Sequence, residues 1–425
     1  MKGVKKSVLC GIATMALSTA ALADQAPDLI QGLSVAQNES RLLTMSFSLT
    51  EDAIVTLDMT TNGVSIGSEN FQTVLDITSN DKKPVLGKVL KQGAHILAWQ
   101  PRREWPGHVF KDSSFAVDLR AWPLQNPPDY MVVDLATPSN RTYYVSAKDL
   151  PGGIKTADPE DAEAVNALTN DPYRTTKLVM RRVPASGNKW LMGSPTTETS
   201  WRSASEVQHY VTLTEDFYIG IYPLTCAQVK RSPIEARFSV VSPWAISFNT
   251  FRGTPATAAY NWPEGRAIDP NSHLGNMRAF TGLQFDLPTE AQREFACRAG
   301  TSGAFCDNSA NGLDVGWGID NAEGKGLLPV GLKNPNLWGI YEMHGNAMEW
   351  TLDRWDTLPQ DAQVDPEGPA TGDGSYRVLK GAHAGENLIV KGRSASRTKG
   401  TTDKNFYNSG YTGVRVVCPI TAPAE

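Results

Sequence analysis

The chain has 425 residues, of which 40 are lysine or arginine and 45 are aspartate or glutamate, so its formal net charge is −5 at pH 7. Hydrophobic residues make up 40% and charged residues 20%, which excludes a disordered or low-complexity chain and leaves enough apolar surface for more than one folded domain. An acidic balance without a long basic run argues against nucleic acid or an anionic membrane surface as the main partner.

The first 23 residues have the pattern of an export signal. Lys2, Lys5 and Lys6 precede a short apolar run, and Ala21 and Ala23 supply the small residues of a cleavage site. The apolar run is well short of the roughly 20 residues that a membrane-spanning helix needs. We therefore expect residues 1–23 to be a cleaved signal peptide, with no membrane span, and the protein to be secreted or periplasmic.

Residues 24–148 are predicted to form an all-β domain. Residues 53–59 alternate around β-branched side chains, and Asn62-Gly63 follows as a turn signal. Similar short runs recur at residues 42–49, 95–99, 114–119, 130–135 and 142–146. Short strands at this spacing, without a helical period between them, predict a β-sandwich of immunoglobulin-like size. No group of catalytic residue types stands out, so we expect a role in spacing, docking or contact with a glycan.

Residues 149–176 differ in composition from their neighbours. Pro151-Gly152-Gly153 opens an acidic stretch with few large apolar side chains, which predicts a linker or a strapping loop. One helix is predicted beyond it. Thr289 and Gln292 have the spacing of a capping box, and Gly300 supplies a left-handed stop.

Residues 177–419 carry a series of tryptophan- and glycine-rich motifs. The motifs lie at residues 190–194, 206–213, 217–220, 287–300, 338–350, 377–381, 393–397 and 413–415. In this order they closely resemble the formylglycine-generating enzyme family, whose members are also called sulfatase-modifying factors. The resemblance implies an α+β fold in which a C-type-lectin-like domain follows the all-β domain. It also implies an oxidoreductase scaffold that acts on an exported protein or a small thiol.

Residues 342–349 form a candidate cation site. Two carboxylates flank a tight glycine turn that can aim backbone carbonyls inward, and hard oxygen ligands suit Ca²⁺. The resemblance implies the same structural calcium site, with ligands from the side chains of Glu342 and Glu349 and the carbonyls of Gly345 and Ala347. The alternative is that Glu349 pairs with a nearby arginine. We expect the neighbouring His344 to pack or to form hydrogen bonds.

The copper chemistry of the family is not expected in this chain. Formylglycine-generating enzymes oxidise a substrate cysteine with O₂ at copper held by two cysteines, and the resemblance places these cysteines between residues 381 and 393. This interval contains no cysteine, so the soft ligands that suit Cu(I) are missing. His383 and Glu386 are the candidate catalytic or metal-binding pair there, but two ligands are too few to predict iron or copper. The alternative is a polar loop without a metal.

The resemblance also implies disulfide bonds. It pairs Cys297, on the predicted helix, with Cys418, in the strand after residue 415, which leaves Cys226 and Cys306 as a second pair. The sequence alone leaves all three pairings of these four cysteines open, and buried thiols are a further alternative.

Two functions remain open at this point. The first is a formylglycine-generating-enzyme-like oxidoreductase scaffold, and the second is a non-catalytic lectin-like module that binds a peptide or a glycan. A basic cluster near the candidate loop, with Arg393 and Arg397 as proposed binding residues, is suited to an anionic ligand. Its other members are Lys391, Lys399 and Lys404, and the alternative for the cluster is a solvated loop.

Overall fold

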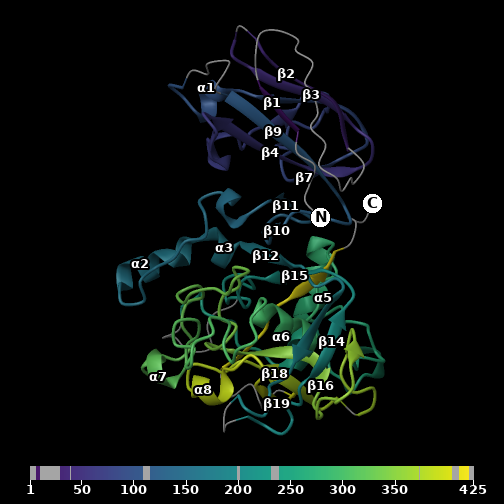
Figure 1. Cartoon of the computed structure of the whole chain (residues 1–425), viewed down its shortest axis with the longest axis vertical. Coiled ribbons are helices and arrows are strands. Elements are labelled where there is room, and N and C mark those ends of the chain that lie inside the picture. Colours follow the sequence, from purple (N-terminus) through teal and green to yellow (C-terminus); the bar gives the residue numbers. More distant parts are fainter. Residues whose placement is uncertain are drawn as a thin grey trace. The chain divides into compact units, whose positions relative to one another are not determined.

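The computed structural model describes residues 6–9, 29–38, 40–108, 115–198, 202–230, 239–372, 374–403 and 411–420 (Figure 1). The chain divides into two compact units. Unit 1 consists of Met1–Met131, Arg141–Ile154 and Thr421–Glu425, and unit 2 consists of Val132–Asn140 and Lys155–Ile420. In the ranges that are described, no helix is long and apolar enough to cross a membrane.

Unit 1 consists mainly of two sheets that share one hydrophobic core. Its strands are β1 (Lys6–Leu9), β2 (Ile30–Gln37), β3 (Leu43–Leu49), β4 (Ala53–Thr61), β5 (Val64–Ser65), β6 (Leu75–Asp76), β7 (Lys88–Leu90), β8 (Gly93–Trp99), β9 (Phe115–Pro123) and β11 (Arg141–Tyr144). One sheet has the order β1-β9-β4-β5, with β7 also on β4, and the other has the order β2-β3-β8-β6. Every second side chain of β3 is buried, as the alternating pattern predicts for a half-buried strand. The core combines Met45 and Leu97 of one sheet with Val55 and Leu119 of the other.

The predicted strands of this region are present, including β10 (Tyr130–Asp134). The sequence did not predict β2, nor the short helix α1 (Pro101–Glu104) after β8. Of the predicted signal peptide only Lys6–Leu9 is described, as a strand antiparallel to β9. The rest of that segment lies outside the described residues, so export remains a prediction.

Unit 2 is built from small sheets and short helices. One sheet contains the neighbours β10, β12 (Lys177–Val183), β15 (Phe217–Gly220) and β21 (Val417–Pro419). A second has the order β13 (Asn188–Met192), β14 (His209–Leu213), β17 (Gln363–Val364). A third has the order β19 (Arg397–Thr401), β18 (Tyr376–Lys380), β16 (Met348–Arg354), β20 (Thr412–Gly413). The helices are α2 (Ala162–Ala167), α3 (Pro172–Thr175), α4 (Phe248–Arg252), α5 (His273–Thr281), α6 (Glu290–Arg298), α7 (Ile319–Ala322) and α8 (Leu388–Lys391). This mixture agrees with the predicted α+β class.

Helix α6 begins as the sequence predicted. The Gln292 amide donates to Thr289 Oγ1 at 3.2 Å, and the Thr289 amide donates to Gln292 Oε1 at 3.0 Å, which is a complete capping box. The helix stops one residue earlier than expected, because Ala299 (φ 46°) is already left-handed before Gly300 (φ 92°). α6 packs beside β16 and β18 (Figure 1), and all of its side chains except that of Gln292 are buried. It therefore carries charged side chains into the interior of unit 2.

Much of the predicted linker belongs to unit 2. Residues 155–176 contain α2, a 3₁₀ turn at Leu168–Asn170 and α3. Asp171 accepts a hydrogen bond from the Tyr173 amide at 3.1 Å and forms an ion pair with Arg174, which is fully buried. Arg174 also donates to the carbonyls of Lys155 and Val330, both at 2.8 Å. This segment fits the strapping-loop alternative better than the linker. Its acidic residues cap a helix and form an ion pair inside unit 2.

Candidate functional site

The predicted calcium residues lie in the interior of unit 2, at the start of β16. Glu342 and Asn346 adopt left-handed backbone conformations with φ of 51° and 65°. A side chain at Gly345 would collide with the backbone of Trp317. The turn is therefore as tight as the sequence predicted.

Two arginines bind the carboxylate of Glu349. Arg293 Nε donates to Oε2 at 2.6 Å, and Arg415 Nη2 donates to Oε1 at 2.8 Å. Nearby carbonyls are occupied as well, because Arg293 also donates to Met343 O at 3.0 Å and Arg415 to Tyr341 O at 2.7 Å. Burial raises the pKa of Glu349, but the two guanidinium groups outweigh it and lower that pKa below its usual value. This is the arginine pairing that the sequence left open as the alternative.

Glu342 is held by a different part of the chain. Its Oε1 accepts a hydrogen bond from the Gly331 amide at 2.7 Å, and its Oε2 is buried without a hydrogen-bond partner among the described residues. Burial is the main influence on this carboxyl group and raises its pKa to about 7.

These contacts do not fit the predicted calcium site. One of its carboxylates is neutralised by two guanidinium groups, and the other is held at the Gly331 amide. Across the described part of the chain, no three His, Cys, Asp or Glu side chains are arranged to hold a metal ion.

His344 packs and forms hydrogen bonds, as expected. Its Nδ1 lies 2.8 Å from the Gly392 carbonyl, its Nε2 lies 3.1 Å from the Cys306 amide, and Cys297 Sγ is 3.5 Å from the same Nε2. Burial lowers the pKa of His344, but the neighbouring Cys297 and Cys306 outweigh it and raise that pKa well above its usual value. His344 thus connects the end of α6 to two neighbouring loops.

The predicted disulfides are absent, and the structure has Cys226, Cys297, Cys306 and Cys418 as buried thiols. Val417 belongs to the same core cluster as Cys297, whereas Cys418 does not. Neighbouring residues of a strand point to opposite faces, so Cys418 faces away from Cys297. Cys226 Sγ approaches the Pro243 carbonyl instead, and Cys306 packs in a separate cluster.

The candidate loop, residues 383–386, follows β18 and is partly exposed. His383 Nε2 lies 3.8 Å from Glu386 Oε2, and the two side chains are 18% and 24% exposed. The Gly385 amide donates to His383 Nδ1 at 3.0 Å, so the neutral ring carries its proton on Nε2. Burial is the main influence on His383 and lowers its pKa, against the opposing effect of Glu386. The structure therefore brings the two predicted residues together, with His383 in its neutral form.

The sequence missed a third residue of this loop site. The ring of Tyr411 stacks on His383, with 4.5 Å between the ring centroids and 14° between the planes. No local pattern links residues this far apart in the chain. The three residues place an imidazole N–H, a carboxylate and an aromatic ring together, all of them groups that can bind a polar ligand.

The thiols of the described chain lie in the interior. Cys306 shares a core cluster with Ala382 and Leu388, which places it beneath the candidate loop, but it is 4% exposed. The segment between Cys306 and Cys418 contains no other cysteine. Cys297 lies close to Cys306, since both residues contact Nε2 of His344, and both are buried. The loop itself therefore offers no soft ligand for Cu(I).

The proposed anion-binding arginines are buried and paired. Arg393 Nη1 and Nη2 donate to the two carboxylate oxygens of Glu206, each at 2.8 Å, and Nη1 also donates to Glu198 at 2.6 Å. Arg397 makes the same kind of two-point contact with Glu290, at 2.6 and 2.7 Å. Their charges are used inside the unit, which disfavours the predicted role in binding an anionic ligand. Lys404, the last member of the basic cluster, lies outside the described residues.

Comparison with known proteins agrees with the resemblance found in the sequence. Residues 174–420 match the model of the FGE-sulfatase family, described as a sulfatase-modifying factor enzyme 1-like domain. This match covers more than half of the chain, which therefore belongs to the FGE-sulfatase family.

Individual relatives match shorter segments. The formylglycine-generating enzyme of Bos taurus is 32% identical over 142 residues, which are 29% of this chain and 37% of the relative. The enzyme of the same name from Thermomonospora curvata is 31% identical over 145 residues, 29% of this chain and 47% of the relative. The chain thus matches less than half the length of either curated relative.

Solved structures show a distant similarity. PvdO from Pseudomonas aeruginosa has a TM-score of 0.42 and 22% identity, covering 57% of this chain and 94% of PvdO. The Treponema denticola variable protein 1 has a TM-score of 0.43 and 19% identity, covering 57% of this chain and 96% of that protein.

Proposed function

We propose that this chain is an exported protein of the formylglycine-generating enzyme type that binds a peptide segment of another exported protein without oxidising it through copper. The observation that carries the proposal is the composition of the candidate loop. His383 and Glu386 stand together there beside the Tyr411 ring, the loop itself contains no cysteine, and Cys306 beneath it is buried.

The chemistry of the loop supports a peptide as the ligand. A peptide backbone offers carbonyl acceptors and amide donors, which match the Nε2–H of His383 and the carboxylate of Glu386. The stack on Tyr411 restricts the imidazole ring, which lowers the entropy cost of binding. The relatives named formylglycine-generating enzymes also make a protein segment the natural ligand class to test.

The proposal also covers the N-terminal segment and unit 1, whose roles are predicted from sequence patterns alone. Residues 1–23 would direct export and be removed, and unit 1 would be an immunoglobulin-like sandwich that spaces or docks the family domain. Mass measurement of the chain recovered from the periplasm or medium tests the first part, because cleavage after Ala23 gives a defined new N-terminus.

One experiment tests binding and oxidation together. The mature chain is incubated with a fluorescent C-x-P-x-R peptide, Cu(I) and O₂; anisotropy measures binding and mass spectrometry measures the peptide product. We expect binding with an unchanged peptide mass, and about tenfold weaker binding for His383→Ala, since one polar contact is lost. Lys189→Ala, at an exposed position of β13 outside the basic cluster, is the control and should bind as the parent does. Conversion of the cysteine to an aldehyde, or equal binding by both variants, would overturn the proposal.

A further inference from the structure

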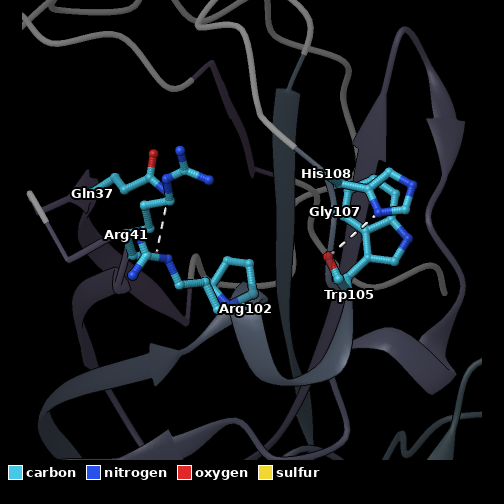
Figure 2. Close-up of a pocket in the computed structure, with 7 residues that line it drawn as sticks. Gln37, Arg41, Arg102, Trp105, Gly107 and His108 are labelled. Atoms are coloured by element: carbon cyan, nitrogen blue, oxygen red, sulfur yellow. Dashed lines mark hydrogen bonds between the residues drawn. The ribbon is translucent and has the colours of Figure 1, made fainter.

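Unit 1 contains a small surface pocket with a cavity volume of about 60 Å³. It lies between the turn that joins β2 to β3 and the segment that begins with α1. Figure 2 shows Gln37 and Arg41 at one side of this pocket and the rings of Trp105 and His108 at the other. Arg102, from α1, and Gly107 complete this part of the lining.

The turn side of the pocket is held in place by hydrogen bonds. Arg41 has a left-handed φ of 65°, which is unusual for a side chain of this size. Its amide donates to Asn38 O at 2.9 Å, the Leu42 amide donates to Asn38 Oδ1 at 2.9 Å, and Gln37 Nε2 donates to Arg41 O at 3.3 Å. The turn therefore presents Arg41 and Gln37 from a fixed backbone.

The opposite side is held by packing. Trp105 packs against the hydrophobic core of unit 1, and His108 lies on its ring with 3.8 Å between the centroids and 3° between the planes. His108 Nδ1 lies 3.2 Å from the Pro106 carbonyl, which fixes the orientation of the imidazole. The stack thus supports an exposed, flat aromatic surface.

The lining is positively charged in a protein of net charge −5. None of the described residues that line the pocket is acidic, whereas two are arginine. The carboxylate of Glu104, the acidic residue of α1, accepts the Thr73 amide at 2.8 and 3.2 Å. The Glu104 carboxylate is therefore held at the Thr73 amide and is not among the residues that line the pocket.

We propose that this pocket binds an acidic sugar, meaning a carbohydrate ring that carries a carboxylate. Two guanidinium groups match the planar, bidentate geometry of a carboxylate, and the Gln37 amide can serve hydroxyl groups as donor and acceptor. The flat His108–Trp105 stack offers a surface for the apolar face of a sugar ring. At about 60 Å³ the cavity itself admits only the carboxylate and its nearest ring atoms, so the rest of the sugar would lie over the exposed aromatic stack.

Calorimetric titration of the full mature chain tests this assignment. The probe is trigalacturonate, and the neutral comparison is maltotriose. We expect the first to bind and the second to give no signal. Arg102→Ala should weaken trigalacturonate binding at least about tenfold, because charge-assisted contacts are lost. Arg41→Gly should do the same while keeping a residue that accepts the left-handed backbone.

Arg103→Ala is the matched control, since Arg103 is exposed and adjacent to Arg102 but does not line the pocket. It removes the same charge and should leave the affinity unchanged. Equal losses in the Arg102 and Arg103 variants would show unspecific attraction, and absence of trigalacturonate binding would refute the site. If glucose 1-phosphate binds more tightly than trigalacturonate, the pocket prefers a phosphate to a carboxylate, and the proposal is overturned as well. A negative result for this pocket would not bear on the peptide-binding site proposed in unit 2.

Discussion

Glu349 lies on β16, which pairs with β18, and the 383–386 loop follows β18, yet the charged groups of the two regions are in opposite situations. Glu349 is fully buried and bound by two arginines. His383 and Glu386 remain partly exposed, and the His383 amide donates to Glu386 Oε2 at 3.3 Å. Buried charges need partners because desolvation is costly, whereas exposed groups can remain available to a ligand. The comparison teaches that a carboxylate in a family motif indicates a site only after its burial and partners are known.

The largest expected effect comes from breaking the buried cluster. Glu349→Leu leaves Arg293 and Arg415 without their shared carboxylate, and we expect it to lower the free energy of unfolding by about 3–5 kcal/mol in urea denaturation. The control is Glu367→Ala, which removes a surface ion pair with Arg266 and should cost about 1 kcal/mol or less. Similar losses in the two variants would show that burial does not separate these pairs.

Glu342 should give the next largest effect, and it should depend on pH. Its pKa is raised from 4.5 to about 7 in the folded state, so the unfolded chain releases this proton first and stability falls as pH rises across that window. Glu342→Gln keeps the shape without the charge and should stabilise the protein at pH 8 by up to about 3 kcal/mol, a gain that disappears near pH 4. Unfolding curves at several pH values measure it. A gain that is the same at every pH would contradict the buried, proton-holding carboxyl group.

A smaller effect is expected for the exposed loop. His383→Ala should change the free energy of unfolding by about 1 kcal/mol or less, because the side chain is partly exposed and its ring nitrogens make few protein contacts. Its peptide affinity should fall as described above. A large loss of stability without a change in peptide affinity would show that His383 has a structural role, as Glu349 does.

The smallest expected effect is that of calcium. Because two guanidinium groups occupy the Glu349 carboxylate, millimolar CaCl₂ or EDTA should leave the thermal midpoint of unfolding unchanged. A bound ion at 100 times its dissociation constant would add about 2.7 kcal/mol of stability, which calorimetry detects easily. MgCl₂ at the same ionic strength is the control. A rise in the midpoint with Ca²⁺ alone would restore the calcium site.

The accuracy of the sequence predictions follows the range of the interactions involved. Several strands of unit 1 and the start of α6 rest on patterns within a few residues and were predicted, although β2 was not. The helix α5 was missed although its Ser272 cap and its Gly282 stop are local signals. The pairing of Arg393 with Glu206, the direction of Cys418 and the stack of Tyr411 on His383 depend on distant segments. No spacing within the chain predicts such contacts. The sequence therefore identified His383 and Glu386 of the candidate site but not Tyr411.

The contact of Arg415 with Glu349 has a consequence for the order in which unit 2 assembles. Arg415 follows β20 and precedes β21, the strand that pairs with β15. A growing chain that has not yet reached this point on the ribosome lacks both the second guanidinium and the closing strand. Unit 2 therefore completes its interior only after nearly all of its residues have been synthesised, and nascent chains that stop before residue 415 should be far more sensitive to protease.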